Sequence, residues 1–193
     1  MDEVLSPDTA DAIYDHIEAQ LATEAFRPRA LFERFNIEVL ATTEGALDDL
    51  RWHRQIRDSG WAGRVVTTYR PDAVVDPDFP GFAANVAELG EITGEDTATW
   101  DGYLAAHRAR REYFKGFGAT ASDHGHPSAC TANLPEAEAA ALYEKVLAGD
   151  ATDTEAETFR GQMLTEMAKM SLDDGLVLQI HAGSRRNLSL IHI

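Results

Sequence analysis

Cysteine is almost absent from this sequence, since Cys130 is the single cysteine among 193 residues. An internal disulfide is therefore excluded, which is typical of proteins from a reducing cytoplasm. Basic residues are also scarce: 17 lysines and arginines stand against 33 acidic residues, which gives a formal net charge of −16. A surface of this charge repels phosphate backbones, so we expect no nucleic-acid partner.

Long apolar runs and targeting signals are also missing. No run of about 18 apolar residues occurs, so the sequence predicts no transmembrane helix and no membrane partner. The start of the chain lacks the basic and apolar regions of a signal peptide. No glycine-rich phosphate loop opens a helix, which disfavours a nucleotide-binding fold. We therefore expect a cytoplasmic protein.

What the sequence does contain is an alternation of β-branched runs with amphipathic helices. Strands are expected at 35–40, 64–69, 119–122 and 175–180, and helices at 6–21, 47–59, 82–89, 100–114, 135–147 and 153–171. Strands that alternate with helices favour an α/β fold with a parallel sheet. A complete barrel takes about 250 residues and eight strands. This chain is shorter and shows about half that number of strands, so the sequence predicts an incomplete (β/α)8 TIM barrel with about four of its strands.

Polar residues follow these runs, at the carboxyl ends where such folds bind ligands. Arg70 directly follows the second run and precedes Pro71, which holds its backbone extended. That placement suits a guanidinium that captures a carboxylate in a bidentate manner. The alternative is a surface ion pair with Asp72.

Two histidine positions are candidates for chemistry. His124 and His126 stand two residues apart on an extended segment, where they could share a metal ion. Equally, Asp123 could fix the tautomer of His124 and leave His126 as a loop residue. Spacing alone leaves both interpretations open. His181 ends an apolar strand, a position that is functional more often than structural in such folds.

Five motifs in this sequence resemble, in order, those of the uronate isomerases of the amidohydrolase superfamily. They are LSPDTA (residues 5–10), TTE (42–44) with LDDL (47–50), RPD (70–72), SDH (122–124), and QIHAG (179–183) with RN (186–187). The resemblance implies a (β/α)8 barrel. It also implies the aldose–ketose isomerisation that interconverts D-glucuronate with D-fructuronate and D-galacturonate with D-tagaturonate.

The resemblance also implies roles for particular residues toward a small uronate sugar. Asp123, His124 and His181 are expected to be catalytic, and Arg70, Arg186 and Asn187 to bind the substrate, with Arg70 on its carboxylate. The family holds a divalent metal, with zinc as one candidate, through a first-strand His-x-His and an aspartate after the eighth strand. Neither segment is present here, so no metal ligand is expected among these residues. The family context makes His124 and His126 weaker metal candidates.

The resemblance covers nearly the whole chain, and residues 1–187 are expected to form part of one barrel domain. Residues 188–193 break the motif before them and resemble a translated sequencing-library adaptor, so we expect a non-native tail. The chain alone is expected to be inactive, and a homo-oligomer of the full-length enzyme is left open. Two alternatives remain: a metal-dependent hydrolase of the same superfamily, and a non-catalytic α/β module that binds sugar acids.

Overall fold

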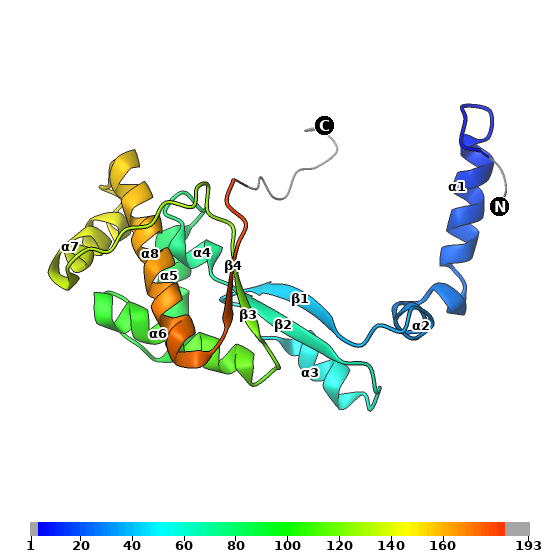
Figure 1. Ribbon diagram of the computed structural model, residues 1–193, viewed down its shortest axis with the longest axis horizontal. Coiled ribbons are helices and arrows are strands. Elements are labelled where there is room, and N and C mark those ends of the chain that lie inside the picture. The colour runs from blue at the N-terminus through cyan, green and yellow to red at the C-terminus, as the bar shows by residue number, and fades with distance from the viewer. Residues whose placement is uncertain (1–3, 184–193) are drawn as a thin grey trace.

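A parallel β-sheet backed by a layer of helices forms the centre of the molecule (Figure 1). The computed structural model describes residues 4–183. Within them the sheet has four strands in the order β1-β2-β3-β4, namely β1 (Leu40–Gly45), β2 (Val65–Arg70), β3 (Ala121–His124) and β4 (Val177–Ile180). All neighbouring strands run parallel. The predicted α/β class with parallel strands is thus confirmed.

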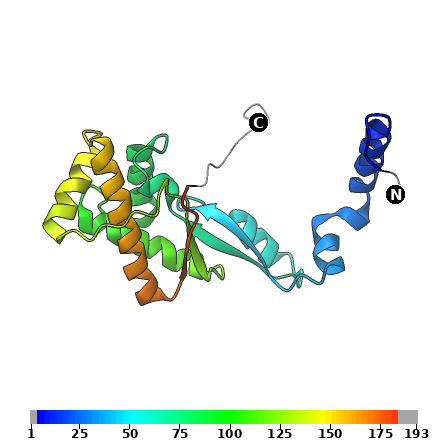
Figure 2. The same ribbon diagram turned by 45° about the horizontal axis from the view of Figure 1, so that its top comes forward.

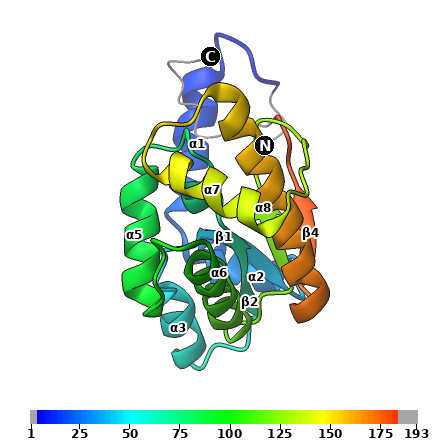
Figure 3. The same ribbon diagram turned by 90° about the vertical axis from the view of Figure 1, so that its left-hand side faces the viewer.

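Helices connect the strands and cover one face of the sheet. Their bounds are α3 (Arg51–Asp58), α4 (Asp72–Val75), α5 (Phe82–Thr93), α6 (Trp100–Lys115), α7 (Glu136–Leu147) and α8 (Asp153–Asp174). Figure 3 shows α5, α6, α7 and α8 in front of the sheet. One helix of the described part, α8, begins with a complete capping box between Thr152 and Glu155 and ends at Gly175, whose φ of +79° suits glycine.

An arm precedes the sheet and extends away from the helical layer (Figures 1 and 2). It consists of α1 (Ala10–Leu21), the short 3-10 helix η1 (Glu24–Phe26) and α2 (Pro28–Arg34). None of the residues of α1 is buried, and Tyr14, Ile17 and Leu21 are all more than half exposed. The helix that the apolar spacing predicted at 6–21 is confirmed as α1. Within the described residues, however, its apolar side chains are not buried against a core.

The core lies between the sheet and its helices and is rich in aromatic rings. Tyr103 of α6 and Tyr143 of α7 stack with centroids 4.5 Å apart, and Phe159 of α8 packs on both. Met163 and Met167 of α8 are fully buried in the same core, as the helical spacing of these methionines predicts. No helix of the described residues is long and apolar enough to cross a membrane.

Polar groups are buried beneath the sheet as well. The Arg111 side chain is fully buried and donates to Asp174 from Nε at 2.5 Å and from a terminal nitrogen at 2.9 Å. Beside it, the Tyr69 hydroxyl and His107 Nδ1 lie 2.8 Å apart. These contacts link α6 to α8 and to β2. They also give buried polar groups the partners that they need to be stable.

The first strand is the element that the sequence places wrongly. We expected it at 35–40, but β1 begins at Leu40 and pairs with β2 from Leu40↔Val65 to Gly45↔Arg70. The chain before it turns at Asn36, whose φ is +50°. Thr42 and Glu44, which follow the predicted strand, therefore lie within the observed β1. The other three strands lie within two residues of their predicted positions.

Candidate functional site

Three predicted site residues meet in one cluster, which we call the Arg70–Asp123–His181 cluster. Arg70 is the last residue of β2, Asp123 lies in β3, and His181 follows the end of β4. Arg70 donates to Asp123 Oδ2 from Nε at 3.0 Å and from a second guanidinium nitrogen. His181 Nδ1 lies in hydrogen-bond contact with Asp123 Oδ1. Each oxygen of one carboxylate thus holds a different side chain.

The strand register explains why these three side chains share a face. Tyr69 pairs with Ser122, and Tyr69 faces α6 through its contact with His107. Successive side chains of a strand alternate between faces, so Arg70 and Asp123 lie on the face away from the helices. Asp123 in turn pairs with Gln179, and His181 lies two residues further along. All three therefore emerge at the carboxyl edge of the sheet, on the side that the helices leave open.

Burial and charge differ sharply within the cluster. Asp123 is 2% exposed, whereas the side chains of Arg70 and His181 are 28% and 55% exposed. A buried carboxylate requires a charged or hydrogen-bonding partner, and Arg70 provides it. Asp72 adds a second carboxylate, 3.9 Å from Arg70 Nε. The arrangement can present a guanidinium and an imidazole to an anionic ligand above the strand ends.

The structure does not bring His124 into this cluster. His124 pairs with Ile180 in the sheet, so its side chain lies on the opposite face from Asp123. It is fully buried, and its Nε2 lies 3.0 Å from Ser122 Oγ. Burial lowers the pKa of His124 to about 3, with His126 as the next cause. Of the three residues expected to be catalytic, the structure thus brings Asp123 and His181 together and places the His124 side chain on the other face.

His126 lies beyond β3 and is 2% exposed. Neither of its ring nitrogens has a hydrogen-bond partner among the described residues, and burial lowers its pKa. The rings of His124 and His126 are 5.8 Å apart and nearly perpendicular. No group of three or more His, Cys, Asp or Glu side chains in residues 4–183 has the arrangement needed to hold a metal ion. The described residues therefore do not fit a complete metal site of their own.

The buried histidines predict how stability depends on pH. Burial lowers the pKa of His107 and of His124 to about 3, whereas a histidine in an unfolded chain titrates near pH ~6.5. Below that pH the unfolded state binds more protons, so the free energy of unfolding falls as the pH decreases. Each histidine should lower the free energy of unfolding by about 1–2 kcal/mol between pH ~6.5 and ~5.

Urea unfolding at several pH values between 7 and 5 measures this slope, in a full-length protein that carries these residues. His107→Gln should flatten the dependence, whereas His16→Gln, at an exposed position of α1, should leave it unchanged. An unchanged slope in His107→Gln would contradict the assignment of a neutral, buried imidazole.

Other predicted residues lie outside the cluster. Arg186 and Asn187, expected to bind the substrate, fall outside the described residues, as does the tail 188–193. Cys130 is exposed and forms no disulfide. The structure thus places Arg70, Asp123 and His181 together, and the roles of all the predicted site residues stay predictions.

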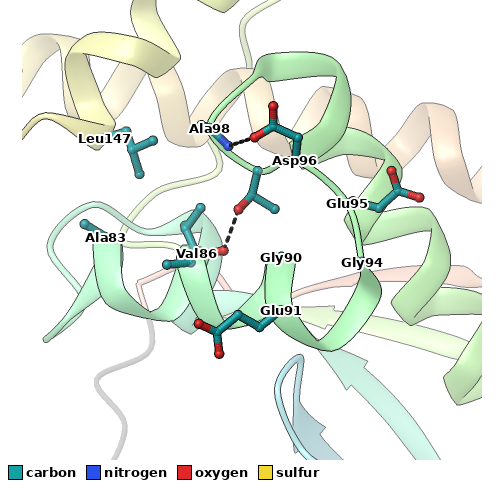
Figure 4. Close-up of a pocket in the computed structure, with 11 residues that line it drawn as sticks. Ala83, Val86, Gly90, Glu91, Gly94, Glu95, Asp96, Ala98 and Leu147 are labelled. Atoms are coloured by element: carbon teal, nitrogen blue, oxygen red, sulfur yellow. Dashed lines mark hydrogen bonds between the residues drawn. The ribbon is translucent and has the colours of Figure 1, made fainter.

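A hollow of about 610 Å³ lies elsewhere, between α5, the connection to α6 and the end of α7 (Figure 4). Small and apolar side chains such as Ala83, Val86 and Leu147 line it, together with Glu91 and Glu95. None of the cluster residues is among its lining residues. A site is defined by convergent polar groups as well as by volume, so the strand-end cluster is the stronger candidate.

One polar group near the sheet was missed at the level of sequence. His53 of α3 is 8% exposed, its Nε2 lies 2.9 Å from Thr42 Oγ1, and it lies 3.7 Å from the Glu44 carboxylate. Glu44 also accepts a hydrogen bond from Thr67. The sequence motifs assigned no role to His53. The TTE motif was the available signal, since Thr42 and Glu44 are two residues apart and both lie on the helix side of β1.

Comparisons with known proteins give a consistent result. A family model described as glucuronate isomerase matches residues 1–191. The curated uronate isomerase of Mesorhizobium japonicum is 67% identical over 98% of this chain and 40% of its own length. That of Rhizobium meliloti is 65% identical over the same shares. The crystal structure of glucuronate isomerase from Caulobacter crescentus superposes with a TM-score of 0.90 at 56% sequence identity. The matched region covers 97% of this chain and 39% of the Caulobacter crescentus chain. The chain thus spans about 40% of the length of these relatives.

Proposed function

Because the chain belongs to the glucuronate isomerase family, we propose that the full-length protein interconverts uronates and ketouronates, with this chain as its sugar-acid-binding part. The substrates that we propose are D-glucuronate and D-galacturonate. The observation that carries the proposal is the Arg70–Asp123–His181 cluster at the carboxyl edge of parallel strands. That edge is where a (β/α)8 barrel binds its ligands, and we propose that the four strands form part of such a barrel.

Arg70 binds the substrate carboxylate in this proposal. Its guanidinium is partly exposed and is held by Asp123 through two of its nitrogens. Arginine has five N–H donors in a fixed planar arrangement, so further donors are present for a ligand. The protein has a net charge of −16, which opposes the approach of an anionic sugar. A local arginine is needed to offset that field.

Asp123 and His181 form a carboxylate–imidazole pair. A carboxylate that accepts from Nδ1 fixes the tautomer in which Nε2 carries the lone pair. His181 is more than half exposed, so its Nε2 is available to take or give a proton at a bound sugar. An aldose–ketose isomerisation moves a proton between adjacent carbons and needs such a group. His124 has no comparable position, and its catalytic role stays a prediction.

A divalent metal belongs to the proposal for the full-length enzyme, where it would polarise the carbonyl or orient hydroxyls. Residues 4–183 do not form a metal site by themselves, so we assign no ligand and no step to them. A cytoplasmic location is also proposed, because the single cysteine leaves no internal disulfide to form. A homo-oligomer of the full-length enzyme and a non-native origin of residues 188–193 both stay predictions.

A chimera tests the proposed activity. Residues 4–183 of this chain replace the matching segment of the Mesorhizobium japonicum relative, which is 67% identical. The purified chimera, loaded with zinc, is expected to convert glucuronate to fructuronate, followed by proton NMR. No turnover of either uronate, by a folded chimera, would refute the proposed isomerase. Hydrolysis of lactones or amides instead would indicate a hydrolase, and uronate binding without turnover a binding module.

A further inference from the structure

The relative position of Arg70 and Asp123 depends on few backbone bonds. Strands β1 and β2 share six pairs of facing residues, and β3 and β4 share four. Between β2 and β3, in contrast, the pairing consists of Tyr69 with Ser122. The two strands that carry the arginine and the carboxylate are thus joined by a short ladder. Side chains must supply the rest of their alignment.

Asp72 supplies such a link. Its Oδ1 accepts a hydrogen bond from the Gly125 backbone N–H at 2.9 Å. Gly125 is the first residue after β3, where the sheet ladder no longer provides a partner. A backbone N–H that is shielded from water requires an acceptor, and here the Asp72 carboxylate, at the start of α4, takes that place. The Asp72 side chain is 14% exposed, so water competes little for this bond.

The same carboxylate also faces the arginine. Its Oδ2 lies 3.9 Å from Arg70 Nε, while Oδ1 holds Gly125. Arg70 thus lies between two carboxylates, Asp123 in contact and Asp72 nearby. The His126 ring, one residue beyond Gly125, is also within the electrostatic influence of Asp72. Asp72 therefore joins the turn after β2 to the turn after β3.

We propose that Asp72 is a positioning residue of the active site, which holds the turn after β3 so that Asp123 meets both Arg70 and His181. The inference rests on the proposed isomerase function and assigns Asp72 no contact with the substrate. Without its bond, Gly125 is free to move away from β2, and Asp123 moves with it. A displacement of about 1 Å in a catalytic group can cost about 100-fold in rate.

Two replacements separate the hydrogen bond from the charge. In the chimera, Asp72→Asn keeps an oxygen that can accept from Gly125, whereas Asp72→Ala removes it. We expect kcat to fall about 10- to 100-fold in Asp72→Ala, with KM changed less, and to stay within about threefold of the parent in Asp72→Asn. Asp101→Ala is the matched control, because Asp101 is also an acidic first-turn residue, exposed at the start of α6.

Hydrogen exchange gives a readout that does not depend on activity. The peptide 121–134 should exchange faster in Asp72→Ala than in the parent, and not in Asp72→Asn. Unchanged exchange in Asp72→Ala would overturn the inference, even if the chimera proved inactive and the proposed function failed. Equal loss of kcat in both variants would overturn it as well, because the charge and not the bond would then be responsible.

Discussion

Replacing Arg70 by methionine is expected to lower kcat/KM for a uronate about 30- to 1,000-fold, which corresponds to about 2–4 kcal/mol of transition-state binding. Methionine has similar bulk and no charge, so the change removes the charged guanidinium at nearly constant side-chain volume. In the structure this guanidinium lies at the end of β2, partly exposed and held by Asp123. Steady-state kinetics of the chimera on glucuronate measures the effect.

The matched control is Arg64→Met. Arg64 is exposed and precedes β2, at the opposite end of the strand from Arg70. It should change kcat/KM less than threefold. Kinetics within threefold of the parent for Arg70→Met would remove Arg70 from the substrate site.

Asp123 complicates a single replacement. It is 2% exposed, and Arg70→Met removes the cation that accompanies its carboxylate. Part of the loss then comes from displacement of Asp123, which has lost this partner. Isothermal titration with glucuronate separates the two causes, because loss of the carboxylate anchor weakens ground-state binding as well as turnover.

The position of the candidate site could be predicted from the sequence because it depends on local signals. Arg70 and His181 each follow a β-branched or apolar run, and such runs end where the carboxyl edge of the sheet begins. Parallel strands bring these ends together whatever the exact bounds. An error of one or two residues in β2 or β4 therefore did not move the cluster.

Other features depend on tertiary contacts that the sequence does not encode locally. The alternating residues 35–40 favour a strand, yet the chain turns at Asn36 and β1 begins at Leu40. Its Thr42 and Glu44, polar in sequence, contact His53 and Thr67. The short helices α2 and α4 were not predicted, since neither is long enough to show a period.

His124 shows most clearly which features of the site the sequence motifs do not predict. The motif at 122–124 suggested that neighbouring Asp and His residues act together. In a strand, adjacent side chains point to opposite faces, so Asp123 and His124 cannot share one site while both lie in β3. We had placed this strand at 119–122, so that Asp123 and His124 would follow it. The observed bounds of β3 place both residues within the strand and therefore on opposite faces.

The surfaces left open in this chain lead to the remaining prediction, on the 193-residue chain by itself. Strands β1 and β4 form the edges of the described sheet, and an unpaired edge is a template for association. Apolar side chains are exposed beside these edges: Leu40 is 43% and Val177 62% exposed. The apolar stripe of α1 is exposed as well. Full burial of such a side chain supplies about 1.5–3 kcal/mol, and each of these side chains forgoes part of that amount.

We therefore expect the purified chain to aggregate or to form loosely packed oligomers, and to show no turnover of glucuronate. The summed losses from several exposed apolar side chains are comparable to the free energy of unfolding of a typical domain, which is about 5–15 kcal/mol. Catalysis is expected to fail for a separate reason, because residues 4–183 contain the proposed sugar-acid site but no group of side chains that could hold a metal ion. Size-exclusion chromatography with light scattering, near-ultraviolet circular dichroism and the NMR assay test both parts, with the chimera as control. A soluble monomer with a sharp thermal transition would contradict the first part, and fructuronate formed from glucuronate would contradict the second.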